Sequence, residues 1–237
     1  MLGKAWRALR SLLFPVRCYV CGEEVSDAAH GICTMCRYNI PLTYFWLTED
    51  NPTRRHLEGL FPLEQASSFY FFTDGSAWRT LIHRFKYGSE WRLARKMGLW
   101  YGTELRSSRL YDDVDIIVPV PLHYRKRLGR GYNQSHYIAE GMAEAMGIEV
   151  EARTVRRVRN NPPQALSDMH TRWKNVEGIF KVADAERLRG RHILLVDDVL
   201  TTGATLSSCA SAIIEAAPDC RISIATLAVT HKVTTMP

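Results

Sequence analysis

The chain has 237 residues, of which 46% are hydrophobic, and it carries a formal net charge of +6. This composition excludes an intrinsically disordered chain, and the length suffices for one α/β domain with a small appendage. The sequence contains no apolar run long enough for a transmembrane helix, so we expect no membrane insertion.

Residues 1–16 combine apolar side chains at helical spacing with three basic residues. Lys4, Arg7 and Arg10 interrupt the apolar core that a secretory signal would need. The pattern predicts a short basic amphipathic helix that packs on the body or on a partner. Binding to a membrane surface is the less favoured alternative.

Four of the six cysteines form two Cys-x-x-Cys pairs, separated by eleven residues. Because each pair can hold one side of a metal ion, the spacing predicts a tetrahedral structural zinc site with the ligands Cys18, Cys21, Cys33 and Cys36. Two disulfides are the alternative, and His30 could replace one thiolate. The lack of a secretory signal favours metal, and with it a reducing, cytoplasmic compartment.

The chain divides by composition into an N-terminal helix and zinc unit (1–47), a polar, proline-containing linker (48–66) and an α/β domain (67–237). In the domain, predicted strands alternate with helices, which is typical of a doubly wound parallel sheet. The expected strands are 67–73, 115–118, 148–155, 178–182, 192–196 and 222–229, and the expected helices are 78–85, 91–105, 134–146 and 204–216.

Residues 193–205 have the pattern of a buried strand, an acidic pair, a small polar loop and a helix start. Asp197 and Asp198 fall at the carboxyl end of the strand, where open α/β sheets bind ligands, and their carboxylates can accept hydrogen bonds from ribose hydroxyls. Backbone N–H groups after the pair can converge on a phosphate; this loop comprises Thr201, Thr202, Gly203, Ala204 and Thr205. The alternatives are an Asx turn or a P-loop nucleotidase, but the chain has no G-x-x-x-x-G-K-[ST] sequence.

This pattern resembles the 5-phosphoribosyl 1-diphosphate (PRPP) motif of the type I phosphoribosyltransferases. The resemblance implies a doubly wound sheet of that kind, with Asp197 and Asp198 on the ribose 2- and 3-hydroxyls, the loop on the 5-phosphate, and Mg²⁺ accompanying PRPP. A diphosphate leaving group also needs a second anion site. After the strand 115–118, two prolines fix the backbone and a basic run follows, so we expect diphosphate binding by Val120, Leu122, His123, Arg125, Lys126, Arg127 and Arg130.

The segment 156–176 is long and lacks periodicity, which is typical of a lid. In the type I fold the corresponding loop closes over PRPP and excludes water, so Gln164 and Arg172 are expected lid residues. A mobile surface loop is the alternative. A second basic cluster, Arg153, Arg156, Arg157 and Arg159, is either a solvated face or a binding surface.

Taken together, the motifs resemble the ComF/GntX family over nearly the whole chain; they are the four-cysteine unit, 118–122, 127–134, 164–167 with Arg172 and Asn175, and 193–205. The resemblance implies a zinc unit joined to a phosphoribosyltransferase-type domain, and an association with single-stranded DNA and DNA-uptake proteins in competent bacteria. We therefore expect a Mg²⁺-dependent phosphoribosyltransferase with an unknown acceptor. The alternative is a non-catalytic protein that handles single-stranded DNA and uses PRPP only as a ligand, which the basic clusters and the aromatic Tyr132 and Trp173 would suit.

Overall fold

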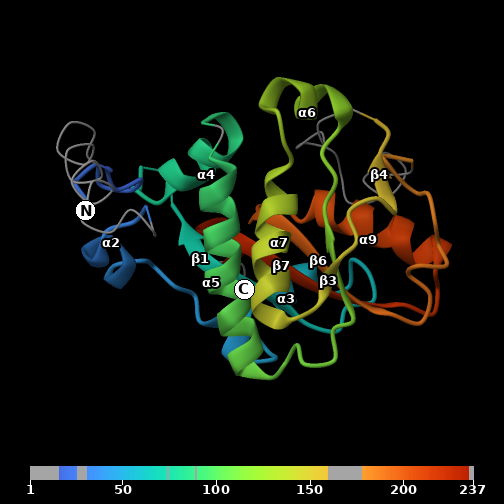
Figure 1. The fold of residues 1–237 in the computed structure, drawn as a ribbon. Helices are drawn as coiled ribbons and strands as arrows, with labels where there is room; N and C mark the ends of the chain where they lie inside the picture. The colour runs from blue at the N-terminus through green and yellow to red at the C-terminus, as the bar shows by residue number, and fades with distance from the viewer. Residues whose placement is uncertain (1–15, 26–30, 74, 89, 160–177, 235–237) are drawn as a thin grey trace, which may run out of the picture.

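The computed structural model describes residues 16–25, 31–73, 75–88, 90–159 and 178–234. At its centre lies a five-stranded sheet in the order β1-β7-β6-β2-β3 (Figure 1). All four strand pairings are parallel, which confirms the expected doubly wound class. The strands are β1 (Ala66–Phe72), β2 (Ile116–Pro119), β3 (Glu149–Val150), β6 (His192–Leu200) and β7 (Arg221–Thr230).

Helices cover both faces of the sheet, so the central strands are apolar on both sides. In β6, Leu194 and Val196 pack into a core with the helices α4, α5 and α7, whereas Ile193 and Leu195 pack with α9 on the opposite face. These helices are α4 (Arg79–Tyr87), α5 (Trp91–Ser108), α7 (Gln134–Met146) and α9 (Ala204–Ala216). The predicted bounds of α7 and α9 are confirmed.

Helices α5 and α7 run side by side across one face (Figure 1) and approach closely because glycines lie at the contact. A Cβ on Gly141 of α7 would lie 2.0 Å from the carbonyl oxygen of Arg95, and a Cβ on Gly98 of α5 would lie 2.1 Å from that of Ile138. The side-chain-free positions therefore set the spacing of this layer.

Two predicted strands differ from the structure by more than two residues at an end. The stretch 148–155 is not one strand: β3 ends at Val150, and β4 (Val155–Arg157) pairs antiparallel with β5 (Phe180–Val182) in a separate sheet. Glu151 accounts for the break, because its carboxylate accepts a hydrogen bond from the N–H of Arg153 and turns the chain. Strand β6 instead continues through the acidic pair to Leu200, since β7 pairs with it that far.

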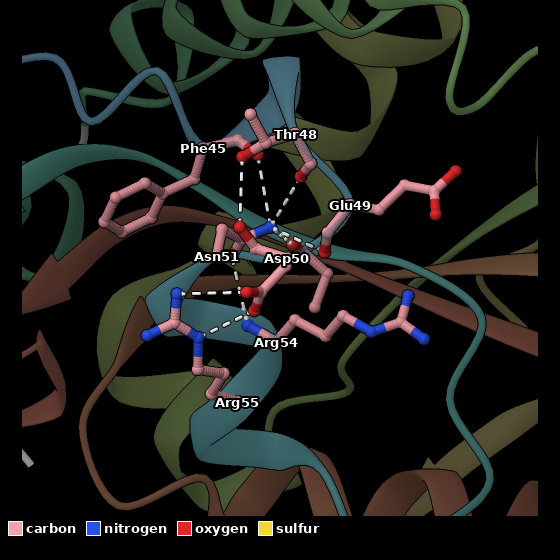
Figure 2. A network of polar contacts seen from close by, with 8 residues as sticks. Phe45, Thr48, Glu49, Asp50, Asn51, Arg54 and Arg55 are labelled. Carbon is pink, nitrogen blue, oxygen red and sulfur yellow. Dashed lines mark hydrogen bonds and ion pairs between the residues drawn. The ribbon is translucent and has the colours of Figure 1, made fainter. Parts of the chain in front are cut away.

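The expected linker 48–66 contains a helix, α3 (Pro52–Leu57), and is packed against the body. Figure 2 shows Asn51 at the start of α3, where its Oδ1 accepts a hydrogen bond from the N–H of Arg54. Its amide nitrogen donates to the carbonyls of Thr48 at 3.0 Å and Ala66 at 2.9 Å. Asn51 is 2% exposed. Within the segment expected to be a linker, a buried amide thus satisfies the surrounding carbonyls.

The four-cysteine unit is also attached to the body. It includes α2 (Thr34–Tyr38) and is followed by the short 3₁₀ helix η1 (Phe45–Leu47). Residues 41–43 run antiparallel along the edge of β1, with hydrogen bonds from Phe71 N to Pro41 O and from Thr43 N to Phe69 O. Cys18 and Trp46 are buried in the core shared with α5.

The amphipathic helix expected in residues 1–16 falls almost entirely outside the described residues. In the part of the chain that the structure describes, no helix is long and apolar enough to cross a membrane.

Candidate functional site

The two segments expected to hold PRPP meet at one edge of the sheet. Strands β2 and β6 are neighbours, with Pro119 in register with Val196. The chain leaves β2 toward α7 and β6 toward α9, and these helices pack on opposite faces. The carboxyl ends of β2 and β6 therefore flank the topological switch point, which is where open α/β sheets bind their ligands.

Asp197 is surrounded by protein atoms, although it keeps some accessible surface. Its Oδ1 accepts hydrogen bonds from the Ser135 hydroxyl at 2.9 Å and from the N–H of Asp198 at 2.8 Å. Burial, together with the charge of Asp198, raises the pKa of Asp197 to about 7. This carboxyl therefore exchanges a proton near neutral pH.

Asp198 has different partners because neighbouring residues of a strand face opposite sides. Its Oδ2 forms an ion pair with Lys86 Nζ of α4 at 3.0 Å. The hydroxyl of Tyr70, on β1, is buried near this carboxylate and has no hydrogen-bond partner among the described residues. Burial and the charge of Asp198 raise the pKa of Tyr70. Lys86, Tyr70 and Ser135 were not predicted as site residues, because the sequence does not show that α4, β1 and α7 meet the acidic pair.

The expected phosphate loop lies directly after β6. Thr201 and Thr202 are exposed, and Gly203 has a φ of 76° where α9 begins. No side chain caps this helix among the described residues, although Ala204 N lies 3.4 Å from the Thr202 hydroxyl. Ala204 and Thr205 are half-buried in the first turn, whose N–H groups can therefore receive an anion.

Helix α3 packs beneath this loop. A Cβ on Gly203 would lie 2.8 Å from Leu57 Cδ2. The imidazole of His56 is near the backbone of Thr201 and Thr202; burial lowers its pKa, and hydrogen bonding to that backbone opposes the shift. The segment 52–60 thus supports the loop, which the expectation of a linker did not anticipate.

Some of the residues expected to bind diphosphate already form hydrogen bonds within the fold. The N–H of Val120, expected to face diphosphate, already donates to Val196 O at 2.9 Å in the sheet. His123 is buried and begins α6 (Tyr124–Arg130), a helix not predicted from the sequence; its Nδ1 accepts a hydrogen bond from the N–H of Arg125. Burial and the charges of Arg125, Arg157 and Lys126 lower the pKa of His123. Leu122 is half-buried beside it.

One residue of the basic run, Lys126, lies near cations of other elements. Burial and the charges of Arg157, Arg130 and Lys86 lower the pKa of Lys126, so these three cations lie close enough to influence it. They come from three elements: α4, α6 and β4. Arg125 instead bonds to the Tyr124 hydroxyl, and Arg127 is exposed.

Within the second basic cluster, Arg157 alone is half-buried, and the charge of Asp197 influences its pKa. The other three residues are exposed; they are Arg153, Arg156 and Arg159. This cluster therefore divides into one site residue and three surface residues. The expected lid residues Gln164 and Arg172 lie outside the described residues.

The four cysteines Cys18, Cys21, Cys33 and Cys36 converge as their spacing predicts. Their sulfur atoms all lie within 4.8 Å of one another, and none of the four forms a disulfide. The sulfurs of Cys21 and Cys33 are 3.7 Å apart, and tetrahedral zinc with bonds of about 2.3 Å separates its ligand sulfurs by about 3.8 Å. The N–H groups of Val20 and Cys33 donate to Cys18 Sγ. The donor set therefore fits a structural zinc ion.

The comparisons with known proteins agree with this geometry. A family model described as "Phosphoribosyl transferase domain" matches residues 133–237, which include the acidic pair and the loop. The fold and the match define a phosphoribosyltransferase-type domain.

Curated relatives extend the similarity beyond that domain. The chain is 26% identical over 214 residues to the DNA utilization protein YhgH of Salmonella typhimurium, covering 84% of this chain and 91% of the relative. It is 28% identical over 131 residues to competence protein F of Haemophilus influenzae (54% and 57% covered) and 26% identical over 226 residues to competence protein ComFC of Bacillus subtilis (94% and 88%). The chain is therefore similar over most of its length to the DNA utilization protein YhgH and to competence protein ComFC.

Two solved structures overlap the chain less well. Glutamine PRPP amidotransferase from B. subtilis is 22% identical, with 55% of this chain and 26% of that chain covered and a TM-score of 0.36. Adenine phosphoribosyltransferase from Saccharomyces cerevisiae is 16% identical, with 60% and 71% covered and the same TM-score. Overlap at this level does not bear on function.

Proposed function

We propose that the carboxyl ends of β2 and β6 bind PRPP, and that the protein transfers the phosphoribosyl group to an acceptor. The observation that carries the proposal is the arrangement at the switch point. The acidic pair lies on β6 just before the start of α9, which no side chain caps among the described residues and which suits a phosphate; the cations Lys86 and Arg157, suited to a diphosphate, lie near Asp198 and Asp197. Asp197 and Asp198 would hold the ribose, residues 201–205 the 5-phosphate, and Lys126, Arg130 and Arg157 the diphosphate.

The reaction breaks the bond between C1 and the diphosphate oxygen, which takes the electron pair, and forms a bond from the acceptor to C1. The acceptor proton passes to solvent, and diphosphate leaves. Mg²⁺, carried with PRPP, would neutralise charge on the phosphate groups. The protein contributes by orienting the ribose and compensating the leaving charge, which can supply most of the catalysis in such a transfer.

Calorimetric titration tests the binding. We expect Mg-PRPP to bind the wild type at least about tenfold more tightly than inorganic diphosphate, because only PRPP reaches the acidic pair and the phosphate loop. In the double variant Asp197→Asn, Asp198→Asn this advantage should disappear while diphosphate binding persists. Asp112→Asn removes an exposed carboxylate and serves as the matched control. A folded wild type that releases no heat with Mg-PRPP would overturn the proposal.

We also propose that the four cysteines hold one structural zinc ion, which fits a reducing compartment such as the cytoplasm. Because Cys18 lies in the body core, metal loss should loosen the packing around Trp46. Elemental analysis should find one zinc per chain in the wild type and in Cys220→Ser, and less than half of that in Cys36→Ser. Equal zinc in both variants would contradict this assignment.

A second candidate function is binding of single-stranded DNA, in line with the names of the relatives, which refer to DNA utilization and competence. Exposed Tyr87 and Tyr124 each lie under an arginine, with Arg130 at 5.5 Å and Arg125 at 5.8 Å from the ring centroids. Rings backed by cations can stack on bases. In this role the protein would bind PRPP without turnover and would work with DNA-uptake proteins.

Fluorescence anisotropy with a single-stranded oligonucleotide separates the two functions. We expect affinity to fall steeply with salt and to weaken in the double variant Tyr87→Ala, Tyr124→Ala. Tyr38→Ala, which removes an exposed ring from α2, should have little effect. No binding at low salt would eliminate this candidate.

A further inference from the structure

The last turn of α4, residues 84–87, contacts the four-cysteine unit, the α6–α7 connection, α6 and the acidic pair. We infer that Lys86 in this turn is a positioning residue that compensates and orients Asp198 in the phosphoribosyl site. The inference rests on the proposed function. It concerns a helix outside residues 133–237, the part of the chain that matches the phosphoribosyl transferase domain.

The ion pair between Lys86 and Asp198 is well shielded from solvent. Nζ lies 3.0 Å from Oδ2, and the two side chains are 27% and 12% exposed. A carboxylate at this depth is costly to ionise without a compensating cation, and solvent screens a shielded pair only weakly. Lys86 therefore compensates the carboxylate of Asp198 and fixes the position of the oxygen that it contacts.

The turn that carries Lys86 is held on both sides of it. The guanidinium of Arg84 lies 5.2 Å from the ring centroid of Tyr19, which belongs to the four-cysteine unit. The carbonyl of Phe85 accepts a hydrogen bond from the Tyr132 hydroxyl, and Arg130 covers the ring of Tyr87. Because these contacts reach the cysteine unit, the α6–α7 connection and α6, the turn from which the Lys86 side chain extends is held in place, and the ion pair with Asp198 positions the ammonium.

The charges around the acidic pair explain why this position matters for the ligand. PRPP carries several negative charges, and two uncompensated carboxylates beside its ribose would repel them. Lys86 removes this repulsion at Asp198 and belongs to the same cation group as Lys126, Arg130 and Arg157. Asp198, paired with Lys86, can then accept a hydrogen bond from a ribose hydroxyl without opposing the diphosphate.

The first test is calorimetric titration of Mg-PRPP at pH 8. We expect Lys86→Met to weaken binding at least about tenfold, whereas Lys86→Arg, which keeps the charge, should stay within about threefold of the wild type. Lys181→Met removes an exposed lysine of β5 and should change affinity less than about twofold. If Lys86→Met bound Mg-PRPP as tightly as the wild type, the inference would be wrong.

The second test needs no ligand, so it separates this inference from the proposed function. Carboxyl ¹³C NMR can follow the titration of Asp197, whose carboxyl is influenced by Asp198, Ser135 and Lys86 and lies near Arg157 and Cys209. The lysine charge lowers the pKa of Asp197, so the midpoint should rise in Lys86→Met and return toward the wild-type value in Lys86→Arg.

An unchanged Asp197 midpoint in Lys86→Met would overturn the inference whatever the calorimetry shows. If the midpoint rises but wild-type protein does not bind Mg-PRPP, the proposed function fails while the control of the acidic pair by Lys86 stands.

Discussion

Leu57 of α3 fills the space next to Gly203, the residue that begins α9: a Cβ on Gly203 would lie 2.8 Å from Leu57 Cδ2. Gly203 also has a φ of 76°, which L-residues rarely adopt. We expect Gly203→Ala to lower the free energy of unfolding by about 1–3 kcal/mol in urea denaturation, because strain and crowding add. It should also weaken Mg-PRPP binding, since the loop would have to shift.

Gly147→Ala is the matched control. Gly147 has a φ of 74°, but a Cβ there would meet no atom within 4 Å. This variant should lose only about 1 kcal/mol and leave Mg-PRPP binding unchanged. Equal losses of stability and of affinity in both variants would show that the contact with Leu57 is unimportant.

The sequence predicts those parts of the central sheet that have one strong pattern of apolar, acidic and small residues. The segment 193–205 shows a buried strand, an acidic pair and a helix start, and these are the places where β6, Asp197 and α9 lie. The prediction of one strand over 148–155 was wrong because the alternation of apolar and polar residues continues through the segment. Its first part, β3, pairs with β2, whereas β4 pairs with β5. The strand propensity of a segment does not indicate which other strand it pairs with.

The partners within the site could not be predicted in the same way. Lys86 lies on a helix whose basic residues look solvated in the sequence, and only the tertiary packing of α4 brings it to Asp198. Asn51 likewise looks like a loop residue, although its amide nitrogen lies within 3.5 Å of four backbone carbonyl oxygens. Long-range contacts of single polar residues leave no periodic signal.

The raised pKa of Asp197 gives the stability a definite dependence on pH. An unfolded aspartate titrates near about 3.9, whereas burial and the charge of Asp198 raise the folded value to about 7. Between these values the folded state binds more protons than the unfolded state, so stability falls as pH rises through this window and levels off above it. Asp197→Asn should therefore stabilise the protein at pH 8 by roughly 1–3 kcal/mol.

Urea denaturation at pH 4 and pH 8 checks this sign. The gain from Asp197→Asn should shrink toward pH 4, where the wild-type carboxyl is protonated in the folded state. Asp112→Asn, an exposed change, should show no comparable trend. A gain that is larger at pH 4 than at pH 8 would contradict the assignment.

Asn51 should be a major stabilising residue of the segment before β1. Asn51→Ala removes the helix cap at Arg54 N and leaves the carbonyls of Thr48 and Ala66 without this donor (Figure 2). We expect a loss of about 2–4 kcal/mol in the free energy of unfolding, from the cap and the buried carbonyls together. Asn39→Ala, at an exposed helix end, should lose less than about 1 kcal/mol, and similar losses in both variants would refute the role of the network.

Opposite predictions follow for two helical glycines, Gly141 at the contact between α5 and α7 and Gly129 in α6. At Gly141 a Cβ would lie 2.0 Å from Arg95 O and 2.5 Å from Leu99 N, and backbone atoms cannot move aside as a side chain can. Gly141→Ala should therefore force the helices apart and lower the free energy of unfolding by about 3 kcal/mol or more. At Gly129 in α6 a Cβ would meet nothing within 4 Å, so Gly129→Ala should instead stabilise by about 0.5–1 kcal/mol through helix propensity. Urea denaturation of the two variants distinguishes a packing limit from propensity, because propensity alone would make both substitutions stabilising.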